Sequence, residues 1–164
     1  MERYRHTQIG WLTDIFLSIA LVGCAFAIAM TLREPNTPPG AKATLAIVTA
    51  ILAIALLLFW SLTVVVRRDA VELTFGWGPI GKTFMLKDIV SCGRVRNHWS
   101  WGWGIRWVPR WWPIGDGFGG WLFNISGLDA VEIEMNNGRV YRIGTDDPAG
   151  LEKAIRDALT ERGR

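Results

Sequence analysis

The sequence predicts an α+β protein in which a transmembrane hairpin of two helices precedes a small antiparallel β-domain capped by a C-terminal helix. Three observations predict this fold class. Two long apolar stretches fill most of the first 66 of 164 residues, strand-like alternation follows over residues 63–143, and the tail has a helical period. We therefore divide the chain into a hairpin at residues 1–62 and a β-domain at residues 63–164.

Both apolar stretches are long enough to cross a membrane. Residues 9–32 contain one ionisable side chain, Asp14, and residues 43–66 contain none. A helix of such length spans the ~30 Å hydrocarbon layer, and two helices without charge on any face exceed what a small soluble domain can cover. We expect helices at about 9–32 and 43–62, with 66 as the alternative end of the second. The Pro-rich segment 33–42 between them must reverse the chain, so both termini lie on one side.

Basic residues beside the helices predict the orientation. Two lie in the connecting segment, Arg33 and Lys42, and four lie on the side of the termini: Arg3, Arg5, Arg67 and Arg68. The excess of positive charge places the termini and the β-domain in the cytoplasm. Trp11 and Trp60 then lie at the inner membrane interface, where amphipathic rings act as anchors.

The two cysteines do not indicate a disulfide framework, because Cys24 lies in an apolar stretch and Cys92 in a predicted strand. Residues 21–24 also fit a bacterial lipobox, in which Cys24 would be cleaved and lipidated. The apolar residues that continue to Leu32 favour an intact helix instead. A cleaved signal peptide fits less well, since its apolar region is shorter.

Alternating apolar residues predict two β-hairpins. In residues 64–75 a tight turn at Asp69-Ala70 sets Arg67 opposite Glu72, and Val66 opposite Leu73. Further strands are expected at residues 82–85 and 89–95.

The second hairpin covers residues 131–143, and its loop has three residues, 136–138, with Gly138 in the left-handed region. This register pairs Ile133 with Tyr141 and keeps one face apolar, while Glu132 faces Arg142 on the solvent side. The tail is then predicted to be a helix at residues 148–162, with Asp147 as N-cap and Pro148 in the first position.

Four segments resemble the bacterial pleckstrin-homology-like domains, which in many membrane proteins follow a pair of transmembrane helices. They are residues 102–106 (Gly-Trp-Gly-Ile-Arg), 127–134, 137–139 (Asn-Gly-Arg) and 143–148, ahead of a final helix. The resemblance implies a small β-sandwich or barrel closed by a C-terminal helix, in the cytoplasmic (inner) membrane of a bacterium. It also implies a binding or assembly scaffold, not an enzyme, and it supplies no ligand residues.

Motifs with catalytic chemistry are weak in this chain. Residues 76–83 fit the phosphate-loop pattern G-x-x-x-x-G-K-[ST] and make nucleotide binding a remote alternative. The pattern needs a helix N-terminus, however, and the residues after Lys82 favour a strand. Two His and two Cys do not make a four-ligand zinc set, and the net charge of +3 comes without a basic run. We expect no cofactor, no metal and no nucleic-acid partner.

Tryptophan is the informative residue, because seven of the ten lie between Trp99 and Trp121. Trp99, Trp101, Trp103 and Trp107 alternate as in a strand, with the first three partly in the core. A hundred-residue domain does not readily enclose so many indoles. We expect six residues to contact the membrane interface or a partner: Arg106, Trp107, Arg110, Trp111, Trp112 and Phe118.

These residues suggest a non-enzymatic, membrane-anchored binding module whose Trp/Arg-rich loop contacts lipid headgroups of the phospholipid bilayer. Core filling is one alternative for the indoles. The other is a subunit of a membrane assembly, with a second copy or another membrane protein as partner.

Overall fold

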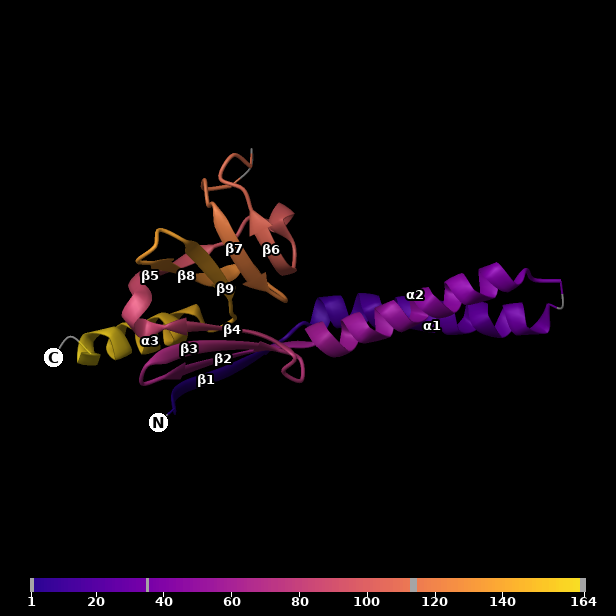
Figure 1. Cartoon of the computed structure of the whole chain (residues 1–164), viewed down its shortest axis with the longest axis horizontal. Helices are drawn as coiled ribbons and strands as arrows, with labels where there is room; N and C mark the ends of the chain where they lie inside the picture. The colour runs from indigo at the N-terminus through magenta and orange to yellow at the C-terminus, as the bar shows by residue number, and fades with distance from the viewer. Residues whose placement is uncertain (1, 35, 113–114, 163–164) are drawn as a thin grey trace.

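The computed structural model describes residues 2–34, 36–112 and 115–162 and has two parts. Helices α1 (Trp11–Arg33) and α2 (Pro39–Phe59) run side by side away from a two-sheet β-domain, and both ends of the chain lie on the side of that domain (Figure 1). Both helices are long and apolar enough to cross a membrane, at about 35 Å and about 32 Å. All their residues are described, and none is buried.

The β-domain consists of two sheets. The first has the order β1-β2-β3-β4, and its strands are β1 (Glu2–Ile9), β2 (Ser61–Arg67), β3 (Ala70–Phe75) and β4 (Ile80–Met85). The second has the order β5-β8-β9-β7-β6, and its strands are β5 (Ile89–Arg96), β6 (Gly104–Val108), β7 (Gly120–Asn124), β8 (Asp129–Met135) and β9 (Val140–Gly144). The short 3-10 turns η1 (Leu86–Asp88) and η2 (Trp99–Trp101) and the helix α3 (Pro148–Arg162) complete the α+β fold.

The N-terminal residues belong to the β-domain, which the predicted boundary at residue 62 missed. Strand β1 pairs with β2 from Glu2↔Arg67 to Ile9↔Ser61. The second helix correspondingly ends at Phe59, before both predicted ends, because Ser61 already pairs in the sheet. The backbone N–H of Gly10 donates to the Trp60 carbonyl over 3.0 Å. The two helices therefore leave the domain from neighbouring strands.

The register of the second predicted hairpin is confirmed, and that of the first is wrong. Ile133 pairs with Tyr141, and Gly138 has φ +76°. In the first hairpin Val66 pairs with Val71, not with Leu73, because the turn lies one residue earlier. The inward face is unchanged, since the shift moves each strand's partners by two positions. Arg67 Nε still reaches the Glu72 carboxylate, at 2.9 Å, from a neighbouring position.

The second sheet is mixed, which corrects the expectation of a purely antiparallel domain. Strands β7 and β9 are parallel, from Trp121↔Tyr141 to Phe123↔Ile143. In this sheet β8 lies on one side of β9, and β7 of the β6–β7 hairpin lies on the other.

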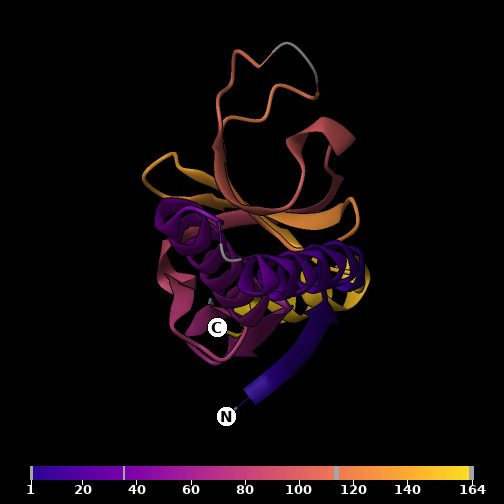
Figure 2. The ribbon, with the colours of Figure 1, turned by 90° about the vertical axis from the view of Figure 1, so that its right-hand side faces the viewer.

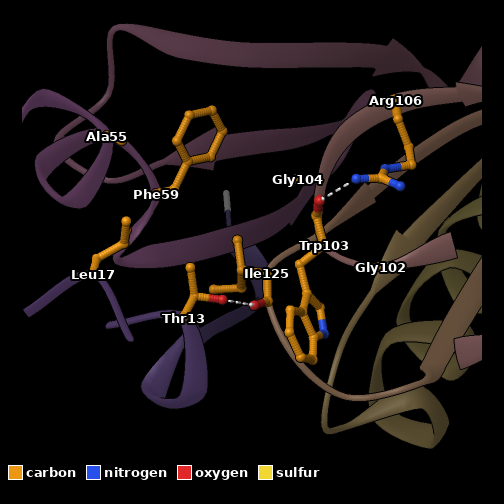
Figure 3. Close-up of a pocket in the computed structure, with 9 residues that line it drawn as sticks. All are labelled: Thr13, Leu17, Ala55, Phe59, Gly102, Trp103, Gly104, Arg106 and Ile125. Atoms are coloured by element: carbon orange, nitrogen blue, oxygen red, sulfur yellow. Dashed lines mark hydrogen bonds between the residues drawn. The ribbon is translucent and has the colours of Figure 1, made fainter. Parts of the chain in front are cut away.

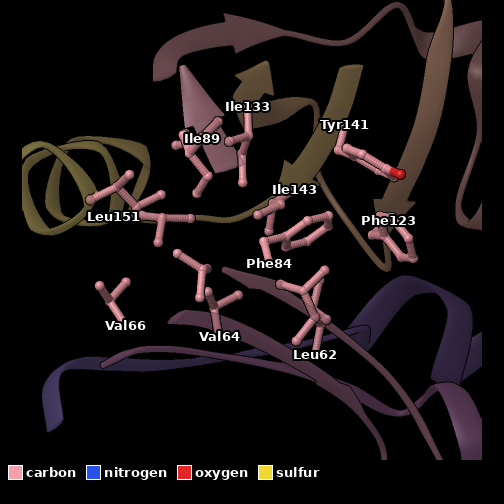
Figure 4. Close-up of a cluster of buried hydrophobic side chains, with 14 of the residues drawn as sticks. Leu62, Val64, Val66, Phe84, Ile89, Phe123, Ile133, Tyr141, Ile143 and Leu151 are labelled. Carbon is pink, nitrogen blue, oxygen red and sulfur yellow. The ribbon is translucent and has the colours of Figure 1, made fainter. Parts of the chain in front are cut away.

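The main core lies between the two sheets (Figure 4). Val64 and Phe84 of the first sheet face Ile133 and Ile143 of the second, and all four are at most 2% exposed. Helix α3 has the predicted bounds and closes one end with three buried side chains, Leu151, Ile155 and Ala158. Asp147 caps it as predicted, because its Oδ1 accepts from the Gly150 N–H at 2.9 Å.

A smaller core cluster covers the outer face of the second sheet, and it is formed by Trp101, Val108, Phe118 and Leu122. The predicted strand through the alternating indoles is wrong before Gly104. Residues 99–101 form η2, and Gly102 and Gly104 have φ +62° and +104°, where an extended strand cannot continue. Trp101 is buried, whereas Trp99 is 73% exposed.

Candidate functional site

Five of the six predicted contact residues are exposed. Arg106 and Trp107 lie in β6, and Arg110, Trp111 and Trp112 lie in the loop between β6 and β7. The exposed fractions of the indoles are 56% for Trp107, 77% for Trp111 and 42% for Trp112. Arg106, Trp107 and Trp112 also line one small hollow of about 90 Å³. We call residues 107–112 and 115–119, which include the three indoles and Arg110, the Trp loop.

Phe118 is not a contact residue, because it is only 5% exposed. Its ring packs against Trp101 at a centroid distance of 5.6 Å. The guanidinium carbon of Arg142 lies 4.2 Å from the Phe118 centroid and 5.2 Å from that of Trp101. Phe118 therefore fastens the end of the Trp loop to the sheet.

Arg142 is the centre of this attachment, and it corrects a second expectation. It pairs with Glu132 as predicted, at 2.7 Å, but its side chain is 3% exposed and does not face solvent. Its Nη2 also donates to Asp116, at 2.5 Å. Its Nη1 is buried without a hydrogen-bond partner among the described residues. The residues that cover Arg142 come from η2 and the Trp loop. The local pattern of the β8–β9 hairpin therefore could not predict that Arg142 is buried.

The charge of Arg142 changes the titration of Asp116. Burial by itself raises the pKa of this carboxyl group, but the hydrogen bond and the positive charge of Arg142 outweigh it. The backbone N–H of Phe118 also donates to Asp116, at 3.2 Å. The pKa of Asp116 is therefore lowered, and the carboxylate stays ionised to hold the loop.

The Trp loop extends across the direction of the helices rather than along it. In Figure 1 it rises from β6 and β7 while the helix pair runs horizontally. Figure 2, seen along the helix pair, shows the same sideways extension. The turn between β7 and β8 reaches the helix base directly, because the Thr13 hydroxyl of α1 donates to the Ile125 carbonyl at 3.3 Å (Figure 1).

Exposed indoles surround the base of the helices. Trp11 and Trp60, the predicted anchors, are 59% and 37% exposed and lie at one level, since Gly10 bonds to Trp60. The β3–β4 turn packs on the end of α2, where a Cβ on Gly76 would lie 2.5 Å from the Leu57 carbonyl oxygen. Its Trp77 is 77% exposed. The sequence pattern predicted a strand after this Gly-rich segment, but it did not indicate that the turn lies against α2.

A cleft of about 450 Å³ lies between the helix base and the second sheet (Figure 3). We call it the junction cleft. One wall comes from α1 and α2, and the other comes from β6, the two residues before it and the turn after β7. The lining residues are Thr13, Leu17, Ala55, Phe59, Gly102, Trp103, Gly104, Arg106 and Ile125.

Arg106 is the charged residue of the junction cleft. Its Nη2 donates to the Trp103 carbonyl at 3.0 Å, and its guanidinium lies over Gly102, where a Cβ would approach within 3.4 Å. Within the described ranges no ion pair involves Arg106. The sequence indicated Arg106, but the helix residues opposite it come from distant parts of the chain.

The phosphate-loop pattern lies on a β-hairpin. Residues 76–79 form the turn between β3 and β4, and Lys82 pairs with Leu73 in the sheet. The pattern requires a helix start after the glycines, and here a strand takes that place. Among the residues that the structure describes, no group of three or more His, Cys, Asp or Glu is placed to hold a metal ion.

No family model, curated protein or solved structure matched the chain in comparisons with known proteins.

Proposed function

We propose that this protein is a non-enzymatic, membrane-anchored binding module. Helices α1 and α2 cross the bilayer, and the β-domain rests on its surface. The observation that carries the proposal is the helix pair itself, which projects from the domain with large apolar side chains exposed along both helices. Exposed Phe16, Val22 and Ile51 have no protein partner that would remove them from water, so lipid is the environment that stabilises them.

The indoles at the helix base support a fixed position of the β-domain relative to the membrane surface. Trp11, Trp60 and Trp77 are exposed where the helices meet the sheets. Tryptophan favours the membrane–water interface because its ring is apolar and its N–H is polar. The interface therefore lies at this junction, which includes the turn of Trp77.

The β-domain is proposed to be pleckstrin-homology-like and cytoplasmic. Two sheets enclose one core, and a C-terminal helix closes one end, as the resemblance implies. The basic residues on the side of the termini support the cytoplasmic placement. Arg3 and Arg5 lie in β1, Arg67 is the last residue of β2, and Arg68 follows it. All four are within the ~15–20 residues of a helix end over which positive charge affects orientation.

The Trp loop is proposed to contact the headgroup layer beside the anchor. Arg110 would approach lipid phosphate while the neighbouring indoles reach the apolar boundary. Trp111 and Trp112, whose rings are 6.4 Å apart, form one aromatic surface for this contact.

Assembly is the second candidate, and the direction of the Trp loop favours it. A loop that extends sideways from a membrane anchor meets neighbours in the plane of the membrane. An indole as exposed as Trp111 suits such an interface, since aromatic residues are enriched in protein contacts.

Fluorescence quenching by phospholipids brominated on their acyl chains separates the two. The Trp111→Ala/Trp112→Ala variant loses part of the quenchable emission if the loop contacts lipid, and Trp121→Ala in β7 serves as control for removing an exposed indole. Unaltered quenching in the double variant, together with a detergent-stable multimer of the wild type that dissociates in it, would replace lipid contact by assembly.

A further inference from the structure

We infer that the junction cleft binds one phospholipid of the surrounding leaflet, with the lipid phosphate on Arg106 and an acyl chain along the base of the helices. This inference rests on the proposed membrane anchoring. It names a ligand for the cleft beside the membrane-spanning helices. Three features of the cleft support the inference: its position, its polarity and the hydrogen bonding of its cation, Arg106.

The position of the cleft connects it with the bilayer. Leu17 and Ala55 line it from the same helices that cross the membrane, one or two turns from their domain ends. Figure 3 shows Leu17, Ala55 and Phe59 on one side and Trp103 and Arg106 on the other. A lipid can enter from the side without leaving its leaflet, because the helix wall continues into the lipid-exposed surface.

The polarity of the cleft matches the boundary of a phospholipid. Leu17, Phe59 and Ile125 give it an apolar wall for an acyl chain. The Thr13 hydroxyl is engaged with the Ile125 carbonyl, at 3.3 Å, and adds no free donor. About 450 Å³ falls within the range of ~300–1,000 Å³ usual for small-molecule sites.

Arg106 is prepared to receive an anion. One of its N–H groups is fixed on the Trp103 carbonyl, which holds the side chain over Gly102. The remaining N–H groups of the planar guanidinium match the oxygens of a phosphate ester. A cation at the edge of an apolar cleft selects a lipid with a phosphate over a neutral lipid with the same chains.

The test measures lipid retention by native mass spectrometry on the full chain released from detergent micelles. The probe is palmitoyl-oleoyl phosphatidylglycerol, and palmitoyl-oleoyl glycerol is the matched lipid without phosphate. We expect the wild type to retain one phosphatidylglycerol and to reject the neutral lipid. Arg106→Gln keeps a donor for the Trp103 carbonyl and should weaken retention about ten-fold, the loss of one charge-assisted hydrogen bond at an exposed site.

Two pairs of variants separate the cleft from general lipid contact. Ala55→Phe fills the cleft and should abolish retention, whereas Ile54→Phe adds an aromatic ring on an exposed helix position and should not. Arg139→Gln removes an exposed cation from the β8–β9 turn and should leave retention unchanged.

Three results would overturn the inference: equal retention by Arg106→Gln and the wild type, equal retention of the neutral lipid, or displacement of the phospholipid by excess inorganic phosphate. Flotation with phosphatidylglycerol liposomes separates this failure from failure of the proposed function. If the chain floats but Arg106→Gln has no effect, only the cleft inference falls; if it does not insert, the proposed function falls as well.

Discussion

Replacing Arg142 by Met should release the Trp loop while the sheets stay folded. The wild-type guanidinium is 3% exposed and joins β9 to Asp116 of the loop and Glu132 of β8. The Met side chain keeps an apolar contact with the rings of Phe118 and Trp101 but offers no hydrogen bond. The change therefore removes the polar attachment and keeps most of the packing.

The structure sets the size of this effect. Leaving a buried charge without a partner costs about 3–5 kcal/mol, but Asp116 and Glu132 have side chains 49% and 33% exposed, and water replaces part of what they lose. Removing Arg142 also removes the cost of burying its charge. We expect the loop to open more easily by about 1–2 kcal/mol, a factor of about 5–30 in the open population.

Hydrogen exchange of the amides around Phe118 measures this opening directly, since local opening sets their protection. Arg142→Met should speed exchange there by that factor and leave β2 and β3 unchanged. Arg139→Met, at an exposed site, is the control. Adding Asp116→Asn to Arg142→Met should give little further acceleration, because both changes break the same pair. Unchanged exchange near Phe118 in Arg142→Met, or full additivity of the two changes, would refute the role of Arg142 as the attachment of the loop.

Three further predictions concern the core, the final helix and pH. Ile143→Ala, at a fully buried position between the sheets, should destabilise the domain by about 2–5 kcal/mol; thermal unfolding in detergent at the wild-type midpoint would contradict the assigned core. Asp147→Ala removes the α3 cap and the acceptor of the Tyr4 hydroxyl, at 3.1 Å, and should cost about 1 kcal/mol, seen as faster amide exchange in the first turn of α3 only. The pKa of Asp116 is lower in the folded protein than in the unfolded chain, so its contribution is present above about pH 4 and is lost as pH falls through the lowered pKa. The protection factor of the amides near Phe118, which is the exchange rate of an unstructured amide at the same pH divided by theirs, should fall in that acid range. An identical fall in Asp116→Asn would show that another group is responsible.

Elements determined by local pattern could be predicted from the sequence. The spanning helices follow from uninterrupted apolar stretches, and α3 from its cap at Asp147 and its periodic apolar residues. The β8–β9 register follows from Gly138, whose positive φ fixes the loop. Each of these signals lies within a few residues of the element that it specifies.

Elements determined by distant partners could not be predicted. The β1 residues are mostly polar, so their local pattern did not indicate a strand. Their hydrogen-bond partners lie in β2, more than fifty residues later. The same holds at the candidate site. Phe118 looked like an exposed loop aromatic because its partners, Arg142 and Trp101, come from other parts of the chain. Leu17 and Ala55 likewise come to line one cleft with Arg106 only in the folded protein.

The central claim is that α1 and α2 lie in lipid while the β-domain lies outside it. Spin labels at residues 22 and 51, which are 70% and 59% exposed near the middle of the two helices, test it by electron paramagnetic resonance in bilayers. Their collision rates with oxygen should be high and those with an aqueous nickel chelate low, whereas a label at Glu134, exposed in β8, should show the reverse. Equal access of the nickel chelate to all three positions would contradict the claim.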